Sequence, residues 1–350
     1  MRIIIFTGGI GTRLWPLSRR NSPKQFSQFV QGKSTLQLAM ERVKSFGFEN
    51  IFLATHERYL SLVKAQLPEL DSSHIFCEPA RRDLAAAVLL TLLRLKQRSI
   101  TGTMTILWSD HFMDYPDRFV QALRQAESLI AQNRQRLVFL GEEPRFANNQ
   151  LGWIHIGQAD DENVYRFVEW KYRPEQTECQ KMFTSGEWLW NLGYFVFDID
   201  FILSLYQQHV PEMYQALSAM VGDEEKIKQN YSKLPALHFD TAILEHIDQN
   251  QAIVLRVKLG WSDPGTLYAL KEALAHSVEE NVSFGNTILK NSRDCLAYNE
   301  EAEKLVVTLG LDGLVVINTK NVLLVCAKAS VSEITKLLCH LEENGQEQYI

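Results

Sequence analysis

The sequence lacks closely spaced cysteines, long apolar runs and an excess of positive charge, and each absence excludes a class of protein. Five cysteines without C-x-x-C spacing indicate neither a disulfide framework nor a zinc site. They are Cys77, Cys179, Cys295, Cys326 and Cys339. No apolar run approaches a membrane span and the first residues already read as a strand, so we expect no anchor and no secretory signal. A net charge of −6 argues against nucleic acid or an anionic membrane as a partner. The scattered cysteines fit the reducing environment of the cytoplasm.

What the chain does have is enough apolar sequence for more than one domain. Its 350 residues, 46% of them hydrophobic, favour one large and one small domain. Strand-like runs alternate with helical stretches over roughly the first two-thirds of the chain. This alternation predicts an α/β fold with a mostly parallel sheet, and ligands beyond the carboxyl ends of its strands. The expected strands are 3–6, 51–54, 104–108 and 137–140, and the expected helices are 34–46, 84–98 and 118–133.

The predicted secondary structure changes from Asn281 onward. Short β-rich runs are separated there by turn-forming Asp-Gly and Asn-Thr-Lys-Asn sequences, which predicts packed short strands. Residues 330–344 then read as a terminal helix, with Ser330 or Ser332 as its cap. The expected domains are residues 1–275, which are α/β, and residues 276–350, which are small and β-rich.

A glycine-rich turn follows the first strand directly. Gly8, Gly9 and Gly11 let the backbone adopt positive φ and approach a ligand closely, while unpaired N–H groups attract phosphate. Arg13 can grip phosphate oxygens in a fork and Lys24 adds a point charge, which suits a nucleoside triphosphate. Such turns also occur without a nucleotide, and neither G-x-x-x-x-G-K-[ST] nor the dinucleotide fingerprint fits this segment.

Asp110 follows the carboxyl end of the strand predicted at 104–108. A carboxylate there is placed to hold Mg²⁺ against phosphates, because that hard ion takes carboxylate and phosphate oxygens. A simple turn aspartate explains the same position equally well. From these residues alone, both interpretations stay open.

The full string around the glycines matches a longer pattern. Gly-Gly-x-Gly-Thr-Arg-Leu-Trp-Pro-Leu-Ser-Arg at 8–19, followed by Pro-Lys-Gln-Phe at 23–26, resembles the signature of the mannose-1-phosphate guanylyltransferases, which are sugar-phosphate nucleotidyltransferases. The resemblance implies a Rossmann-like nucleotide-diphospho-sugar transferase sheet, a left-handed β-helix-like C-terminal domain, and a short form without a fused isomerase domain. It makes Arg13, Lys24 and Asp110 catalytic. The nucleotide-binding residues that it implies are Gly8, Gly9, Gly11, Thr12, Arg13, Lys24, Arg82 and Asp83.

The resemblance also assigns two aspartates to one metal site. Family members usually read Pro-Ala-Asp-His where this chain has Trp-Ser-Asp-His at 108–111, so Asp110 inherits the role of holding Mg²⁺. Gly-Trp-Ser-Asp-Pro-Gly at 260–265 is similar to the family's Gly-Trp-Ser-Asp-Val-Gly, whose aspartate completes the site, and this assigns Asp263. A Ser-Asp-Pro-Gly turn is the alternative at that position.

Base specificity is expected from Glu-Pro-Ala-Arg-Arg-Asp at 78–83. Similar enzymes carry Gly-Arg-Asn-Thr-Ala-Pro-Ala there, so Arg82 agrees with the family and Asp83 differs from it. An ionised aspartate can accept both donors on the Watson–Crick edge of guanine. Asp83 could equally be only the N-cap of the following helix, and the two roles can coexist.

The sugar-phosphate pocket departs most from the family pattern. Phe-Val-Glu-Trp-Lys at 167–171 resembles Phe-x-Glu-Lys-Pro, but Lys171 follows one residue late. On a strand its side chain would then point to the opposite face, unless a bulge restores its direction. The segments at 151–154 and 190–193 keep only part of their patterns. The sugar-phosphate residues implied are Gly152, Glu169, Lys171, Asn191 and Gly193.

The implied reaction needs no protein nucleophile. A sugar 1-phosphate oxygen attacks the α-phosphorus of GTP, a GDP-sugar forms and pyrophosphate leaves, while Mg²⁺ and cationic side chains neutralise the developing charge. The resemblance favours mannose 1-phosphate, and hence GDP-mannose biosynthesis for polysaccharides. Two alternatives stay open: another sugar 1-phosphate such as a heptose, or a nucleotide-binding regulatory relative without turnover. No nucleic-acid or membrane partner is expected, and a homodimer is left open.

Overall fold

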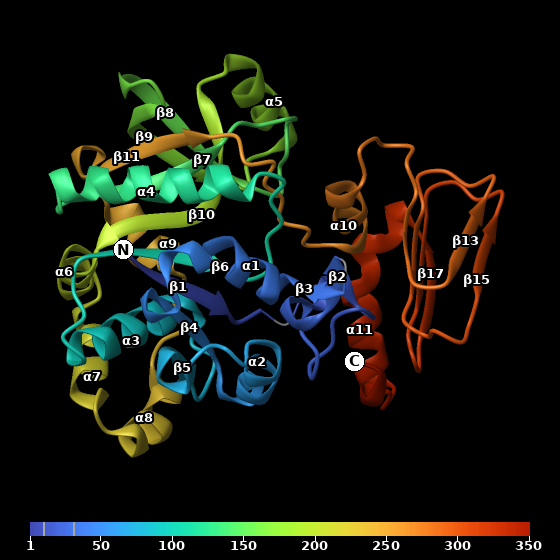
Figure 1. Ribbon diagram of the computed structural model, residues 1–350, viewed down its shortest axis with the longest axis horizontal. Helices are drawn as coiled ribbons and strands as arrows, with labels where there is room; N and C mark the ends of the chain where they lie inside the picture. The colour runs from blue at the N-terminus through green and yellow to red at the C-terminus, as the bar shows by residue number, and fades with distance from the viewer. Residues whose placement is uncertain (10, 31) are drawn as a thin grey trace. The chain divides into compact units, whose positions relative to one another are not determined.

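The computed structural model describes residues 1–9, 11–30 and 32–350 (Figure 1). Ile10, inside the glycine-rich string, therefore lies outside the described residues. The chain forms two compact units, and each is assembled from segments that are distant in the sequence. The domain boundary predicted between residues 275 and 276 stays a prediction. Unit 1 consists of Met1–Gly8, Ala39–Ser109 and Met113–Trp261, and unit 2 consists of Gly9–Leu38, Asp110–Phe112 and Ser262–Ile350.

Unit 1 is built on a nine-stranded sheet with the order β5-β4-β1-β6-β10-β7-β11-β9-β8. β1, β4, β5, β6, β7 and β11 run in the same direction, and β10 is antiparallel to its neighbours β6 and β7. The predicted α/β fold with a mostly parallel sheet is thus confirmed. The strands are β1 Arg2–Thr7, β4 Ile51–His56, β5 Ile75–Glu78, β6 Thr103–Trp108, β7 Leu137–Glu142, β8 Gly152–Asp161, β9 Val164–Tyr172, β10 Trp188–Asp198 and β11 Ala252–Val257.

Helices cover the sheet because their apolar faces need the same burial as the strands. In α4, Phe119, Leu123, Ala126 and Ile130 recur at helical spacing and are all buried. Figure 1 shows α4 lying along the sheet, and it contacts β6, β7, β10 and β11. The described helices of unit 1 include α2 Leu60–Gln66, α3 Asp83–Gln97, α4 Pro116–Gln132, α5 Gln176–Ser185, α6 Ile199–His209, α7 Pro211–Met220, α8 Glu224–Asn230 and α9 Phe239–Ala242, and α1 Thr35–Val43 begins in unit 2 and ends in unit 1.

The four strands and three helices predicted for the first two-thirds of the chain are all present, within a few residues of their predicted ends. The central strands were predictable because they are apolar throughout. In β1, for example, Ile3, Ile4 and Ile5 are all fully buried. β1 and β6 are parallel neighbours, and the Ser109 amide donates a hydrogen bond to the Phe6 carbonyl at 3.2 Å. The two points where the chain leaves these strands, after Thr7 and after Trp108, therefore share one edge of the sheet.

Unit 2 contains short strands, most of which pair in parallel in two sheets. β12, β14 and β16 pair in parallel in one sheet, with Val282, Leu296 and Val315 in register, and β13 pairs in parallel with β15 in another. Strands β12 to β16 alternate between the two sheets, which is the arrangement of a β-helix, and β17 pairs antiparallel with β16. The predicted β-rich C-terminal domain is confirmed. The strands are β12 Val282–Phe284, β13 Thr287–Lys290, β14 Leu296–Asn299, β15 Val306–Leu309, β16 Leu314–Asn318 and β17 Leu323–Ala327, with β2 Gln28–Val30 and β3 Lys33–Ser34 as a separate pair.

The terminal helix of unit 2 begins later than the sequence predicts. A 3-10 helix occupies Lys328–Glu333, and α11 then spans Ile334–Glu343. The predicted caps Ser330 and Ser332 are wrong, because both lie within the 3-10 segment and the position before α11 is Glu333. Leu14 and Trp15, from the glycine-rich string, belong to the same buried cluster as Ile334. The N-terminal segment is therefore part of the core of unit 2, together with α10 Leu267–Leu274 and α11.

Candidate active site

The glycine-rich string is exposed to solvent at some positions and buried at others. Leu14 and Trp15 are buried, whereas Thr12 and Arg13 are exposed on a 3-10 helix, Thr12–Leu14. Gly11 has φ of +68°, and a Cβ atom there would lie 2.9 Å from the Cβ of Lys24. Only glycine suits this position, since it needs both a left-handed backbone and a close approach to Lys24.

Lys24 joins the two aspartates that the family resemblance assigned to a metal. Its ammonium lies 3.1 Å from an Asp110 carboxylate oxygen and 3.4 Å from an Asp263 oxygen. A backbone bridge explains why these acids meet: the Phe112 amide donates to the Ser262 carbonyl at 3.0 Å, and the Ser262 amide donates back at 3.1 Å. All of these residues belong to unit 2.

Burial and charge are arranged to keep Lys24 and Asp110 ionised. Burial alone would lower the pKa of Lys24, but the carboxylates of Asp110 and Asp263 outweigh it, and the pKa lies above its ordinary value. Burial would likewise raise the pKa of Asp110, yet the Lys24 ammonium and then His111 outweigh it and lower that pKa. The Lys24 side chain is only 4% exposed, whereas the Asp110 and Asp263 side chains are 37% and 36% exposed. The two carboxylates are thus partly exposed to solvent, while the ammonium that pairs with both of them is buried.

Arg13 completes the group within unit 2. A Cβ atom placed on Gly265 would lie 3.2 Å from a terminal nitrogen of Arg13, so the guanidinium packs against the backbone that follows Asp263. The structure therefore brings together the four residues predicted to bind triphosphate and metal. These are Arg13, Lys24, Asp110 and Asp263.

A buried carboxylate in unit 1 anchors the segment that leads to Asp263. Glu142 ends β7, is 2% exposed, and accepts hydrogen bonds from the backbone amides of Leu259 at 2.8 Å, Gly260 at 2.9 Å and Trp261 at 3.3 Å. Burial raises the pKa of Glu142, although these three amides oppose the shift. The sequence analysis missed this residue; its signal is an acid placed directly at the end of an apolar strand.

The segment expected to read the base holds Asp83 in an unusual backbone conformation. Asp83 is the first residue of α3 and has φ of +60°, a region that non-glycine residues seldom occupy outside functional or strained sites. Its carboxylate lies 3.3 Å from a ring nitrogen of His238 and accepts from the Leu84 amide at 3.2 Å. Arg82 occupies the N-cap position of α3, with no side-chain capping bond. The alternative role of Asp83 as that N-cap is therefore wrong.

Glu78, at the start of the same segment, is a second residue that the sequence analysis missed. Burial raises its pKa to about 7, while the Tyr231 hydroxyl, which donates to its carboxylate at 2.9 Å, opposes the shift. A carboxyl group that titrates near neutrality within a predicted binding segment is typical of functional sites. The sequence analysis included Glu78 in the segment expected to read the base but gave it no role of its own, because its partner Tyr231 is distant in the sequence.

Asn191 and Gly193 lie at an irregularity in β10. The register with β7 shifts between Asn191 and Phe195, and the Asn191 side chain accepts from the Gly193 amide at 2.9 Å. Gly193 has φ of +71° and its carbonyl accepts from the Trp108 indole at 2.9 Å. A Cβ atom on Gly152 would lie 3.4 Å from that of Asn191. Gly152, Asn191 and Gly193 thus lie together, and their contacts with a sugar stay a prediction.

Lys171 takes a different direction. Its ammonium pairs with Glu178 of α5 at 2.5 Å and lies 5.5 Å from the centre of the Trp188 ring. Glu169 shares this face of β9, whereas Trp170, in the place of the family's lysine, packs against the main core cluster of unit 1. The Lys171 side chain therefore contacts α5, while its backbone carbonyl lies near Gly152, 3.7 Å from where a Cβ atom on that glycine would be.

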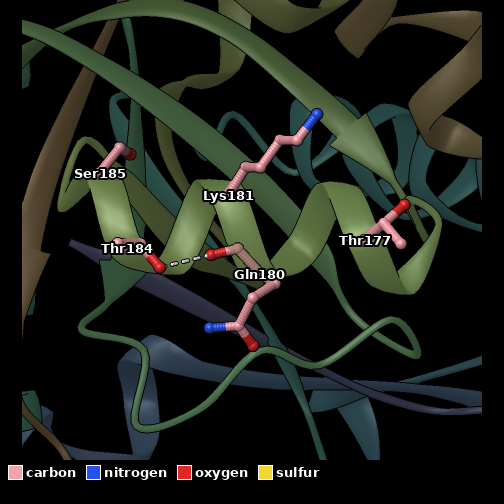
Figure 2. A pocket seen from close by; sticks show the side chains of 5 residues that line it. All are labelled: Thr177, Gln180, Lys181, Thr184 and Ser185. Carbon is pink, nitrogen blue, oxygen red and sulfur yellow. Dashed lines mark hydrogen bonds between the residues drawn. The ribbon is translucent and has the colours of Figure 1, made fainter.

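A hollow on the outward face of α5 is formed by other residues. Figure 2 shows Thr177, Gln180, Lys181, Thr184 and Ser185 along this one helix, with the Thr184 hydroxyl donating to the Gln180 carbonyl. None of them is a predicted site residue. Among the described residues, no group of three or more histidine, cysteine or acidic side chains could hold a metal ion. Nor does any described helix combine the length and apolarity that crossing a bilayer requires.

Comparisons with known proteins agree with this fold. A nucleotidyl transferase family model matches residues 2–280, and a model of the MannoseP isomerase/GMP-like beta-helix domain matches residues 285–341. The mannose-1-phosphate guanylyltransferase RfbM of Salmonella typhimurium is 30% identical over 99% of this chain and 73% of its own length. The alginate biosynthesis protein AlgA of Pseudomonas syringae is 28% identical over 98% of this chain and 72% of its own length.

A solved structure shares the whole architecture. The crystal structure of a protein described as mannose-1-phosphate geranyltransferase from Thermus thermophilus superimposes with a TM-score of 0.88, at 27% identity, over 97% of this chain and 99% of that one. The fold and the matched models define a nucleotidyltransferase enzyme with a β-helix domain. The chain belongs to the nucleotidyl transferase family, and within it to the mannose-1-phosphate guanylyltransferases.

Proposed function

We propose that the protein transfers GMP from GTP to mannose 1-phosphate and releases pyrophosphate. An oxygen of the sugar phosphate forms a bond to the α-phosphorus, and the bond between the α- and β-phosphates breaks as pyrophosphate leaves. The observation that carries this proposal is the group of Arg13, Lys24, Asp110 and Asp263, because it combines cations for phosphate with two hard carboxylates. The proposed product serves polysaccharide synthesis, and a cytoplasmic location and a homodimer stay predictions from the sequence.

The two carboxylates fit a divalent cation. Asp110 and Asp263 both lie within 3.4 Å of one ammonium group, so they already share a positive charge, and both retain exposed oxygens. Mg²⁺ is commonly held by one or two carboxylates together with substrate phosphates and water. When bound, it would neutralise charge on the triphosphate and orient it. Lys24 would hold the two carboxylates close together, and Arg13 would bind phosphate oxygens.

Base and sugar selection is assigned to residues of unit 1. We propose that Asp83 accepts from the guanine edge and that Arg82 contacts the same nucleotide. The exposed carboxylate of Asp83, its positive φ and its contact with His238 support this role. The proposed phosphate contacts of the glycine-rich string come from Gly8, Gly9, Gly11 and Thr12.

The sugar side is proposed to use Gly152, Asn191 and Gly193 for hydroxyl contacts. Glu169 and Lys171 keep their predicted roles at the sugar phosphate. The Glu178 pairing means that Lys171 would have to exchange one anionic partner for another on binding.

A panel of substrates tests the proposal. Five nucleoside triphosphates are combined with mannose, glucose and heptose 1-phosphates, and released pyrophosphate is measured with Mg²⁺ present. We expect GTP with mannose 1-phosphate to give the highest kcat/KM. Turnover only with a heptose 1-phosphate would show that the acceptor is not mannose 1-phosphate. Binding of GTP without pyrophosphate release from any pair of substrates would contradict the proposal that the protein is an active enzyme.

A further inference from the structure

A polar cavity of about 190 Å³ lies in unit 1 beside the carboxyl end of β11. One wall is a face of α4, and the opposite wall is formed by β11, the residues after it and the turn between β8 and β9. None of its lining residues has a role in the proposed reaction. Its polar lining residues are Arg118, Gln121, Gln125, Asn163, Arg256 and Lys258.

The charged side chains that line this cavity are all positive. Arg118, Arg256 and Lys258 all line it, although the chain as a whole carries a net charge of −6. Glu143 accepts from Arg256 at 2.7 Å and from Lys258 at 2.7 Å, so one carboxylate is shared by two cations. The cavity therefore retains positive potential that an anion would neutralise.

The hydrogen-bonding groups of the lining are held in place before any ligand binds. Arg118 stacks over Tyr115, 4.3 Å from the ring centre, and donates one bond to the Lys258 carbonyl at 3.2 Å. The amides of Gln125 and Asn163 bond to each other at 2.8 and 3.2 Å. Arg118 also lies in the first turn of α4, where the helix dipole favours a negative ligand.

We propose that this cavity binds a small phosphate-bearing anion. Guanidinium groups match phosphate oxygens in a planar fork, and the ammonium of Lys258 adds a point charge. The volume lies below the range of roughly 300–1,000 Å³ typical of drug-sized ligands, which favours inorganic phosphate or a phosphate monoester over a nucleoside triphosphate. The ligand is thus expected to differ from GTP.

The cavity is connected to the backbone around the proposed metal ligands. Leu259 lines it, its amide donates to Glu142 at 2.8 Å, and its carbonyl accepts from the amides of Asp114 at 3.1 Å and Tyr115 at 3.0 Å. Ordering of the cavity by a ligand should therefore protect the amides of 114–115 and 259–261 from exchange.

Calorimetry with inorganic phosphate and with glucose 6-phosphate tests the proposal, at constant ionic strength adjusted with chloride. The Arg118→Ala, Lys258→Ala double variant should bind at least about tenfold more weakly, since charge-assisted hydrogen bonds of this kind contribute that much. The Lys226→Ala, Lys228→Ala variant removes the same charge from exposed α8 and should bind as the wild type does.

Hydrogen exchange locates the binding site independently of the proposed reaction. Added phosphate should protect peptides covering 114–125 and 252–261. Tighter binding of glucose 6-phosphate would identify a phosphorylated metabolite, and equal binding would identify the phosphate group alone; either supports the proposal. Equal affinity in the two double variants, or protection confined to other segments, would overturn it.

Discussion

Lys24 shows how a single buried charge can organise a site. It was predicted as a point charge for the triphosphate, and the structure places its ammonium between Asp110 and Asp263. The sequence could suggest that both aspartates belong to one site, because each matches a family motif. It could not show that Lys24 joins them, because that contact depends on the backbone bridge between Phe112 and Ser262.

Substitution of Gly11 by alanine tests the close approach in the glycine-rich string. The new Cβ would lie 2.9 Å from Lys24 Cβ at φ of +68°, so both strain and a clash are expected. We expect unfolding to become easier by about 2–3 kcal/mol, with activity also falling. Gly186 has a similar φ of +72° and open space around it, so Gly186→Ala should cost only about 1 kcal/mol. Equal losses in the two variants, measured by denaturant unfolding, would refute the clash.

The buried carboxyl of Glu78 should leave a signature in the pH dependence of stability. Its pKa rises from 4.5 to about 7 on folding, so the folded state binds more protons than the unfolded state across this window. The free energy of unfolding of the wild type should therefore fall relative to Glu78→Gln as pH rises from 4.5 to about 7. The slope should not exceed about 1.4 kcal/mol per pH unit, and the difference should be constant above and below the window.

Urea unfolding at a series of pH values measures this difference directly. Exposed Glu69 provides the control, and Glu69→Gln should run parallel to the wild type. A wild type whose stability relative to Glu78→Gln rises with pH across the same window would contradict the burial of Glu78.

At the level of elements, apolar strands and amphipathic helices were predictable because their periodicity is carried by neighbouring residues. Irregular positions were not. The direction of Lys171 depends on where the pairing of β9 with β8 slips, between Glu169 and Phe167. No local sequence pattern marks the position of that slip. The 3-10 segment before α11 escaped prediction for the same reason.

Within unit 2, the buried carboxylate of Asp294 links α10 to the β-helix. Asp294 lies 2.7 Å from the ammonium of Lys271, which is fully buried, and it also pairs with Lys328. The Tyr268 hydroxyl donates to the same carboxylate at 3.0 Å. Burial would raise the pKa of Asp294, but hydrogen bonds from Lys271 and then Lys328 outweigh it and lower that pKa.

Loss of this buried charge should destabilise unit 2. Asp294→Asn leaves the Lys271 ammonium buried without its counter-charge, so we expect the free energy of unfolding to fall by about 3–5 kcal/mol. Asp312→Asn breaks an exposed pair with Arg293 and should cost less than about 1 kcal/mol. Thermal and denaturant unfolding of the two variants provide the comparison, and similar small losses in both would show that the buried pair contributes little.

For the whole molecule, the sequence predicted the fold class and the composition of the phosphate-binding group, because both depend on contiguous motifs. It did not predict how the chain alternates between two compact units. Unit 2 takes in Gly9–Leu38 and Asp110–Phe112 as well as the C-terminal segment. Trp15 illustrates the reason: its indole donates to the carbonyl of Tyr349, a partner more than three hundred residues away in the sequence.

Pyrophosphate release from GTP and mannose 1-phosphate, measured in Asp110→Asn and Asp263→Asn, tests nucleotidyl transfer at this group most directly. Each substitution removes a carboxylate charge and leaves the size of the side chain unchanged, and exposed Asp312→Asn serves as the control. We predict that kcat falls about a hundredfold or more in both site variants at saturating Mg²⁺, and stays at the wild-type value in the control. Wild-type turnover in either site variant would contradict the assignment of these two aspartates to the reaction.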